Sequence, residues 1–312
     1  MQNMNKIPLS IIIPAFNERT IISKTINRIN AILSDKVLFE IIIVNNGSTD
    51  GTGEMLHKMK GIKIVDLPEK KTIAFARNAG IVKATYPLIA FLDADILISE
   101  DWGDAIDQLS YTIKNCQMII TGCKVSVSEN PSFIENAWFS KFPEKISANY
   151  INSGNLITTK ALCTLIGGFN ECLITGEDVD FCNRAIEKNT LLMPNNKFKV
   201  YHEGYPKNIQ QFFRREVWHG IGDFKSIETF FKSKVAVISV AFSSLIIGSG
   251  VLFLCQKYFL SLLIVVCLFC FNMYLVYKRF NKIDVPLFTL HILYLFARTM
   301  SFFYRKSTNR NR

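Results

Sequence analysis

The chain lacks the glycine-rich loops that hold phosphate groups in kinases and NTPases. Neither GxxxxGK[ST] nor GxGxxG occurs in its 312 residues, so these enzyme classes are not indicated. A diphosphate ligand would therefore have to be held by side chains and a metal ion.

Cysteines at metal-binding spacing and a secretory signal are also missing. The eight cysteines are scattered, and the one CxxC pair, Cys267 and Cys270, lies in an apolar run where cysteine behaves as a small hydrophobic residue. This usage fits a reducing compartment. The first apolar segment, residues 7–13, is short and contains Pro8, unlike a signal peptide. We therefore expect the N-terminal part of the chain to remain in the cytosol.

Acidic residues are scarce in the last third of the chain. Residues 204–312 contain 15 Lys+Arg but 4 Asp+Glu, whereas residues 1–203 contain 21 and 22. With 49% hydrophobic and 20% charged residues overall, a disordered or fibrous protein is excluded. The basic residues bracket long apolar runs instead of mixing with polar and aromatic residues, which argues against nucleic-acid binding and for membrane lipid as a partner.

Two apolar runs, residues 235–255 and 258–277, are each long enough to cross a bilayer. Only Gln256 and Lys257 separate them, so they predict an antiparallel hairpin. Basic residues precede the first run and follow the second, at the open end of the hairpin, which predicts that this end is cytoplasmic. These residues are Lys225, Lys232, Lys234, Lys278, Arg279 and Lys282.

A third apolar run, residues 285–303, leaves two alternatives open. It contains Pro286, His291 and Arg298, and a polar or charged residue recurs every seven positions from Asp284. If the run spans the membrane, the basic tail lies outside. If it lies in the interface or re-enters, which we favour, the tail stays inside and meets anionic headgroups. The tail residues are Arg305, Lys306, Arg310 and Arg312.

The first 205 residues have the pattern of an α/β catalytic domain. Short β-branched runs alternate with stretches of helical period, which predicts a parallel sheet covered by helices. An amphipathic interfacial connector is expected at 206–234 and a membrane domain at 235–312. We expect strands at residues 9–13, 39–44, 61–65, 88–92, 118–120, 156–159 and 199–201, and helices that include 21–33 and 178–187.

Polar clusters follow three of the expected strands, at residues 14–18, 45–50 and 93–95. Ligands of open α/β sheets bind at the carboxyl ends of strands, so the clusters predict one shared cleft. Asp93 and Asp95, two positions apart on a strand, point the same way. Mg²⁺ or Mn²⁺ takes one or two carboxylates and completes its shell with water and phosphate. The pair predicts a metal-bound diphosphate, the alternative being that both residues solvate a turn.

Other candidates are single residues or pairs. Arg77 and Asn78 are suitable neighbours for the diphosphate, unless the arginine is a solvated helix residue. Glu177 and Asp178 stand near a helix start, where acidic residues are favourable in any case, but their pairing favours a general base for an acceptor hydroxyl. His202, beside an acidic metal site, is a candidate metal ligand or phosphate partner, and otherwise a structural histidine.

The order of these stretches resembles a family 2 glycosyltransferase with the GT-A fold. The stretches that carry the resemblance are residues 10–18, 43–52, 76–80, 91–95 and 166–171 followed by 176–180. The resemblance implies a Rossmann-like mixed sheet with helices on both faces, followed here by the membrane hairpin and the third apolar helix.

The resemblance also implies roles for individual residues. Asp95, with Asp93 and His202, would hold Mg²⁺ or Mn²⁺; Asp178 would deprotonate the acceptor and cause inversion, supported by Glu177. The donor, a nucleoside-diphosphate-sugar, would contact Pro14, Ala15, Phe16, Asn17, Glu18, Asn45, Ser48, Asp50, Arg77, Asn78, Asp93 and Ala94. For the acceptor we expect contacts with Gly154, Asn155, Gly168 and Trp218; the polar residues 152–155 either face the acceptor or only form a turn.

Two departures from the family pattern affect specificity. Asn45 and Asn46 stand where an acidic residue commonly precedes Gly-Ser, and an amide either donates or accepts, so the nucleobase is left open. In residues 211–218 Arg215 stands where the processive synthases have tryptophan.

We therefore expect an inverting glycosyltransferase in the plasma membrane of a bacterium, with its catalytic domain in the cytoplasm. Its acceptor would be a polyprenyl phosphate, a lipid-linked glycan or a polysaccharide of the cell envelope. The alternatives are a processive polysaccharide synthase and, in another class, an inactive membrane scaffold or sugar-nucleotide sensor.

Overall fold

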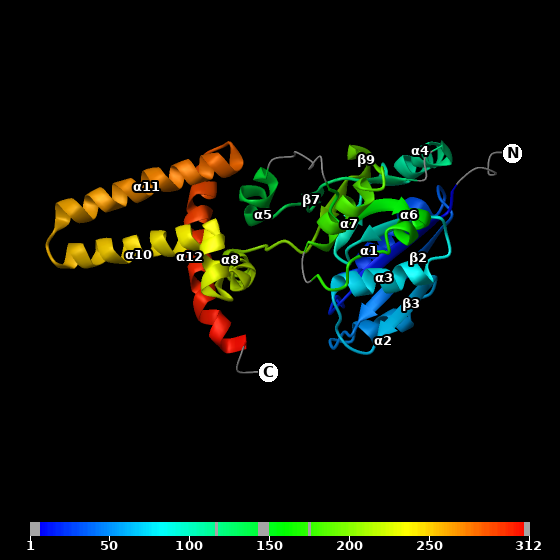
Figure 1. Cartoon of the computed structure of the whole chain (residues 1–312), viewed down its shortest axis with the longest axis horizontal. Coiled ribbons are helices and arrows are strands. Elements are labelled where there is room, and N and C mark those ends of the chain that lie inside the picture. The colour runs from blue at the N-terminus through cyan, green and yellow to red at the C-terminus, as the bar shows by residue number, and fades with distance from the viewer. Residues whose placement is uncertain (1–6, 116–117, 143–149, 174–175, 309–312) are drawn as a thin grey trace. The chain divides into compact units, whose positions relative to one another are not determined.

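The computed structural model describes residues 7–115, 118–142, 150–173 and 176–308, which fold as two units (Figure 1). The N-terminal unit comprises Met1–Glu129 and Glu144–Gly204, and the C-terminal unit comprises Asn130–Pro143 and Tyr205–Arg312. Residues 130–143, which the sequence suggested were part of the first 205-residue domain, fold with the C-terminal unit. Arg310 and Arg312 of the basic tail lie outside the described residues.

A seven-stranded mixed sheet with the order β3-β2-β1-β4-β8-β6-β9 forms the centre of the N-terminal unit. The four strands of residues 9–92 are parallel, as predicted, and β8 is antiparallel to both β4 and β6. The strands are β1 (Leu9–Ala15), β2 (Phe39–Asn46), β3 (Ile62–Leu67), β4 (Leu88–Leu92), β6 (Ile119–Gly122), β8 (Asn155–Thr159) and β9 (Leu191–Pro194).

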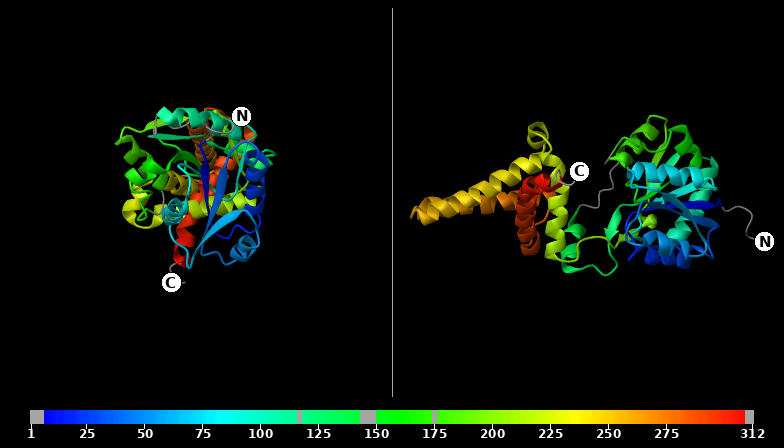
Figure 2. Two further views of the ribbon diagram at one scale, coloured as in Figure 1. Left: turned by 90° about the vertical axis from the view of Figure 1, so that its right-hand side faces the viewer. Right: turned by 90° about the horizontal axis from the view of Figure 1, so that it is seen from below.

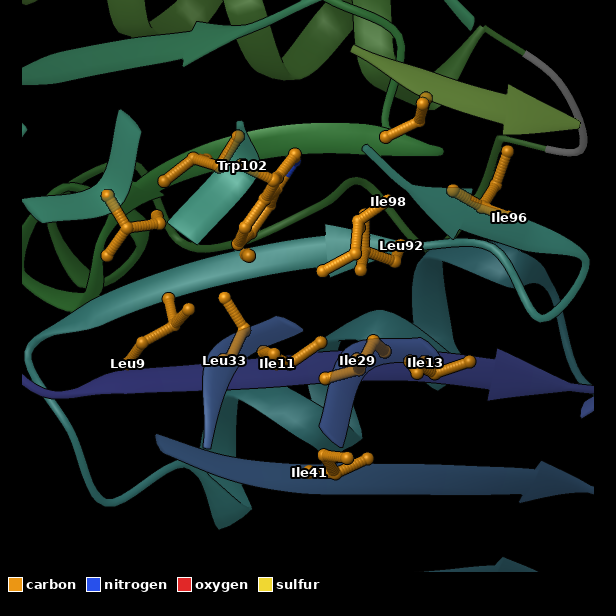
Figure 3. Close-up of a cluster of buried hydrophobic side chains, with 14 of the residues drawn as sticks. Leu9, Ile11, Ile13, Ile29, Leu33, Ile41, Leu92, Ile96, Ile98 and Trp102 are labelled. Carbon is orange, nitrogen blue, oxygen red and sulfur yellow. The ribbon is translucent and has the colours of Figure 1, made fainter. Parts of the chain in front are cut away.

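Helices cover both faces of this sheet, as the fold class predicted. Side chains of α1 and α4 pack on one face and those of α3, α6 and α7 on the other. Figure 3 shows the first core, where Leu9, Ile11 and Ile13 of β1 point toward Ile29 and Leu33 of α1. The helices are α1 (Ile22–Leu33), α2 (Thr52–His57), α3 (Ile73–Lys83), α4 (Trp102–Asn115), α6 (Lys160–Leu165) and α7 (Glu177–Ile186).

A small second sheet brings a late segment of the unit next to the end of β4. It consists of β5 (Ile96–Ile98), β10 (Val200–His202) and β7 (Val125–Val127), in the order β5-β10-β7. The antiparallel register of β10 with β5 pairs His202 with Ile96, directly after Asp95. The sequence predicted β10, but β5 and β7 are three residues long and give no period to detect.

The C-terminal unit is helical. Its two most apolar helices, α10 and α11, form the predicted antiparallel hairpin (Figure 1). Three helices of this unit are long and apolar enough to cross a membrane, with mean hydropathies of 2.3 for α10, 2.5 for α11 and 1.3 for α12. The elements are α5 (Phe133–Ala137), η1 (Phe139–Lys141), α8 (Ile209–Gly220), η3 (Ile221–Phe224), α9 (Ile227–Lys232), α10 (Lys234–Leu254), α11 (Tyr258–Phe280) and α12 (Val285–Thr308).

An aromatic cluster around Trp138 explains why residues 130–143 belong to the C-terminal unit. The indole is 1% exposed and lies 5.0 Å from the Phe280 ring and 5.4 Å from the Tyr294 ring, measured between centroids. The Arg279 guanidinium lies 5.2 Å from the centroid of Trp138, within cation–π range. These partners are more than a hundred residues away in the sequence, so no local sequence pattern predicts the contact.

The contact of α3 with β1 gives a test of the packing. A Cβ on Gly80 would lie 2.3 Å from Cγ2 of the buried Ile12, far inside van der Waals contact. We expect Gly80→Val to lower the free energy of unfolding of the N-terminal unit by about 2–3 kcal/mol, because overpacked cores strain the backbone. Thermal unfolding of the full chain in detergent measures the loss. Lys83→Val, an exposed position of the same helix, should change stability by about 0.5 kcal/mol or less, and equal effects of the two valines would contradict the packing.

Candidate active site

The loops after β1 and β2 are tied together at the carboxyl edge of the sheet. The backbone N–H of Thr49 donates to Asn17 Oδ1 at 2.8 Å, and the N–H of Asn17 donates to Ser48 Oγ at 3.1 Å. Asp50 Oδ1 accepts the N–H of Thr52 at 2.9 Å. The side chains of Asn17, Ser48 and Asp50 thus shape the two loops, and Asn17 itself adopts a left-handed conformation with φ 59°.

A carboxylate that the sequence analysis missed accompanies Asn45. The Asn45 amide donates to Asp66 Oδ1 at 2.8 Å, while its oxygen accepts the N–H of Ser48 at 3.3 Å. Asp66 Oδ2 also lies 2.8 Å from His57 Nε2. Asp66 comes directly after the strand predicted at residues 61–65, so the strand-end rule that found the other clusters could have found it. An acidic group therefore stands beside position 45.

Arg77 joins three elements of the site. Its guanidinium is 3% exposed, and Nη1 lies 2.9 Å from Glu177 Oε1 of α7 while Nη2 lies 3.0 Å from Asp93 Oδ1 after β4. The arginine is therefore not the solvated helix residue that the sequence left open. A buried charge of this kind is stable only when it is paired, and here one cation is shared by two carboxylates.

The turn before β8 lies between these carboxylates. Asn152 Nδ2 donates to Asp178 Oδ2 at 3.2 Å, and Ser153 Oγ donates to Glu177 Oε1 at 3.4 Å. A Cβ on Gly154 would lie 2.5 Å from Asp93 Oδ2, so the close approach requires glycine. The turn thus brings Asp93 near the Glu177–Asp178 pair, although 84 residues separate Asp93 from Glu177 in the sequence.

Asp95 and His202 form the second pair of the site. His202 Nε2 lies 3.4 Å from Asp95 Oδ2, and a Cβ on Gly204 would lie 2.0 Å from the same oxygen. In the described part of the chain, no group of three or more His, Cys, Asp and Glu side chains is arranged to hold a metal ion. Asp93 Oδ1 pairs with Arg77, so of the three expected ligands Asp95 and His202 are the two that contact each other here.

Burial, together with neighbouring negative charges, raises the pKa of several carboxyl groups here. Burial and the charges of Asp95, Asp93 and Asp50 raise the pKa of Glu18 to about 7. Burial also raises the pKa of Asp95; the charge of Asp93 adds to this shift and His202 opposes it. The pKa of Asp178 is raised mainly by burial and further by the Glu177 charge. Burial is the largest cause each time, and the smaller contributions show that acidic groups gather at this edge of the sheet.

The predicted site residues Asn78 and Asn155 make hydrogen bonds to backbone groups of the protein. The Asn78 amide donates to the carbonyl of Phe169 at 2.8 Å and accepts its N–H at 2.8 Å, and Gly168 (φ 71°) packs against the same amide. Asn155 is fully buried and donates to the carbonyls of Cys123 and Phe198. The side chains of Asn78 and Asn155 thus connect parts of the scaffold.

The remaining predicted contacts divide between the two units. Trp218 lies on α8 of the C-terminal unit and is 68% exposed. At the sheet edge, the Phe16 ring is half-buried, and Lys70 Nζ lies 3.8 Å from its centroid. Pro14, Ala15 and Ala94 are buried and can present only backbone groups to a ligand.

Comparison of the sequence with protein families gives a match to "Glycosyl transferase family 2" over residues 10–162. The matched segment contains β1 through β8 and every strand-end cluster described above. Among relatives, glycosyltransferase AglE of Haloferax volcanii is 28% identical over 189 residues, which are 57% of this chain and 61% of the relative. A poly-β-1,6-N-acetyl-D-glucosamine synthase of Staphylococcus aureus is 35% identical over 96 residues, 30% of this chain and 23% of the synthase.

The chain therefore covers about three fifths of the first relative and a quarter of the second. Among solved structures, the mannosyltransferase PcManGT from Pyrobaculum calidifontis, in complex with GDP-Man and Mn²⁺, matches with a TM-score of 0.56 and 16% identity, over 96% of this chain and 88% of that one. GalNAc-T7 with UDP, GalNAc and Mn²⁺ matches with a TM-score of 0.51 and 14% identity, over 70% and 51%. At these identities the likeness establishes the fold, which is GT-A. The sequence match, for its part, assigns the segment of residues 10–162 to glycosyl transferase family 2.

Proposed function

We propose that the protein transfers a sugar, with inversion, from a nucleoside-diphosphate-sugar to an acceptor at the membrane. The observation that carries the proposal is the Arg77 network, which brings a donor-side carboxylate, Asp93, next to the Glu177–Asp178 pair. A base adjacent to the donor is what direct displacement at the anomeric carbon requires. The two structural neighbours that bind GDP-Man or UDP support a nucleotide donor.

The residues present fit a divalent cation. Asp95 supplies a carboxylate and His202 an imidazole, a donor set suited to Mn²⁺ or Mg²⁺ when phosphate oxygens and water complete the shell. Burial is the main cause of the raised pKa of Glu18 and Asp95, and a bound cation would offset the further contribution that neighbouring carboxylates make. Bound there, the metal would stabilise the charge of the departing diphosphate. Both structural neighbours named above contain Mn²⁺.

Asp178 is the proposed base. Its Oδ2 accepts from Asn152, so the carboxylate is oriented by the turn before β8, and burial raises its pKa. It takes the proton of the acceptor hydroxyl while the acceptor oxygen forms a bond to the anomeric carbon. The bond from that carbon to the diphosphate oxygen breaks on the opposite face, which inverts the configuration. Glu177 and Arg77 keep this geometry without contacting the reacting atoms.

A membrane-linked acceptor is supported by the C-terminal unit. Its three apolar helices are long enough for membrane insertion, and a soluble acceptor would give no reason for such an anchor. A polyprenyl phosphate or a lipid-linked glycan at the cytoplasmic face of a plasma membrane fits the proposed orientation. Incubation of purified protein with nucleotide sugars and polyprenyl acceptors tests this, and transfer only to soluble sugars would exclude a lipid acceptor.

The second candidate is a processive polysaccharide synthase, favoured by the likeness to the Staphylococcus aureus synthase. Against it, Arg215 occupies the place of a tryptophan typical of processive enzymes. Arg215 Nη1 lies 3.0 Å from Glu216 Oε1, and the guanidinium lies 4.8 Å from the Phe139 ring centroid. The position is thus used for packing inside the C-terminal unit. The length of the product separates the candidates.

The base assignment predicts the effect of one substitution. We expect Asp178→Asn to lower kcat by about 10²–10⁴-fold, the contribution typical of a general base, with little change in donor affinity. Transfer assays and donor titration by calorimetry measure the two quantities. Glu187→Gln, an exposed residue just after the same helix, is the control and should keep full activity. Turnover by Asp178→Asn near the wild-type rate would remove Asp178 as the base.

The metal assignment predicts a titration of Glu18. Its pKa is about 7 in the folded protein against 4.5 in an unfolded chain, so without metal the folded state binds the extra proton and stability declines as pH rises from about 4.5 through 7. We expect this decline to become smaller in Glu18→Gln, and to weaken in the wild type when Mn²⁺ is added. Thermal unfolding across pH, with chelator or with Mn²⁺, measures it.

Asp95→Asn supplies the matching variant for the metal itself. It should weaken Mn²⁺ binding, observed by the paramagnetic spectrum of the free ion, whereas Asp104→Asn on the surface of α4 should not. Mn²⁺ affinity that is equal in wild type and Asp95→Asn would place the cation elsewhere.

A further inference from the structure

Helix α12 makes polar contacts with both legs of the apolar hairpin. Thr299 Oγ1 lies 2.9 Å from Ser243 Oγ of α10, and His291 Nδ1 lies 2.7 Å from Asn272 Oδ1 of α11. Asn272 is fully buried, and its amide also donates to the carbonyl of Phe288 at 3.3 Å. The helix is thus held against each leg by a side-chain hydrogen bond.

These contacts fix the direction of α12. Ser243 lies nine residues after the start of α10 and Asn272 eight residues before the end of α11. At 1.5 Å per residue, both lie about 12–14 Å from the open end of the hairpin. Their partners Thr299 and His291 are about 12 Å apart along α12 by the same rise. If α12 ran parallel to the hairpin, its two contacts would lie about 12 Å apart along the hairpin axis. They lie at nearly the same distance from the open end, so α12 runs across the hairpin.

The views of the structure agree with this geometry. In Figure 1, α12 runs crosswise to the long axes of α10 and α11, near the open end of the hairpin. In the right-hand view of Figure 2, α8 also lies across the direction of the hairpin. Ser301 of α12 donates to the carbonyl of Val217 on α8 at 2.7 Å, and Gly220 allows the close approach. Two packed helices therefore cross the hairpin at one end.

Arg298, the charged residue of α12 whose side chain the structure describes, faces the protein. Arg298 Nη2 lies 3.3 Å from Glu216 Oε2 of α8, Glu216 is 3% exposed, and Arg298 Nη1 lies 3.7 Å from Asp223 Oδ2. The opposite side of α12 is apolar and open. Val285 is 79% exposed, Met300 38% and Phe303 60%. An apolar outer surface on a crosswise helix matches acyl chains and not water.

We propose that α12 is an in-plane helix sunk into the near leaflet of a phospholipid bilayer, and not a third membrane-spanning helix. The apolar run of α10 begins at Val235 and that of α11 ends at Tyr277, so α12 lies about 8–12 Å inside the apolar segments. In-plane helices bury their apolar face about 5–10 Å below the headgroups. Helix α8 packs on α12, on the side away from the hairpin tip. It then lies near the headgroups and presents its exposed Arg214 and Trp218 to them.

This arrangement has a consequence for topology. Both ends of α12 stay in the near leaflet, on the side of the hairpin where α10 begins and α11 ends. The proposal depends on insertion of the hairpin and not on glycosyl transfer, so it stands or falls separately from the proposed function.

Nitroxide depth measurements test the proposal on the full chain in vesicles of phosphatidylethanolamine and phosphatidylglycerol. Cys116 and the exposed Cys172, Cys255, Cys267 and Cys270 are first replaced by alanine, and single cysteines are introduced by Val285→Cys, Leu293→Cys and Phe303→Cys. We expect the three labels to lie at one depth, within about 10 Å, the width of a helix. Matched labels at exposed positions of α11, from Leu262→Cys, Val266→Cys and Tyr277→Cys, should report different depths.

A sidedness measurement completes the test. Tyr304→Cys, exposed in the last part of α12, should react with a membrane-impermeant thiol reagent from the same side as native Cys172 of the N-terminal unit, which is retained in this variant. A label at Leu293 that is much deeper than those at Val285 and Phe303, or reaction of Tyr304→Cys from the side opposite Cys172, would overturn the proposal.

Discussion

The buried guanidinium of Arg77 is the constraint on which the N-terminal unit depends. It lies on α3, where Gly80 lets the helix approach β1, and it pairs with Asp93 after β4 and Glu177 at the start of α7. Each of these carboxylates, if buried alone, would cost several kcal/mol or bind a proton. One cation thus allows two acidic segments to meet at one edge of the sheet. Because Arg77 is on the same helix that packs over β1, the site and the sheet are positioned by the same contact.

The other carboxylates of the site, those of Glu18, Asp95 and Asp178, are paired with no arginine or lysine in the described residues. Glu18, Asp95 and Asp178 all have raised pKa values, with burial the largest cause in each case. Structural pairs normally lower the pKa of a carboxyl group, as Lys63 does for Glu40 at the far end of the sheet. The contrast separates acidic residues that stabilise the fold from those whose charge is left for a ligand or a proton.

Local patterns predicted the parts of the fold that repeat over short distances. The strands of residues 9–92 were predictable because buried β-branched runs are distinctive. The rule that ligands bind at the carboxyl ends of strands then predicts that Asp93 and Asp95 lie near the clusters after β1 and β2. The same rule applies to Asp66, which pairs with Asn45 near the end of β3. Helix α7 was found through its acidic start. These successes required only that sequence neighbours share an element.

The parts that could not be predicted depend on partners that are distant in the sequence. Asn155 looked like a polar turn residue, but it is buried because two carbonyls, of Cys123 and Phe198, converge on its amide. Asn78 looked like a phosphate contact, but its amide is used by the loop at Phe169. A single sequence shows that such residues are polar but not which group satisfies them. The outcome follows from the rule that buried polar groups are hydrogen-bonded, applied to a tertiary arrangement that the sequence does not display.

In the C-terminal unit, too, the sequence shows which residues are polar but not what they contact, and here the expected surroundings are lipid and not water. The seven-residue spacing of Asp284, His291 and Arg298 has the form of an amphipathic surface helix, whose polar stripe would face water or headgroups. In the structure each of these side chains is used within the protein: Asp284 accepts the N–H of Leu287, His291 meets Asn272, and Arg298 meets Glu216. In a bilayer a polar side chain is unfavourable on the lipid-facing surface of the protein and favourable inside the protein, where it finds partners. A polar stripe on an apolar membrane helix therefore marks the side that contacts protein. Periodicity identifies the stripe in both solvents, and only the packing partners decide which side of the helix faces outward.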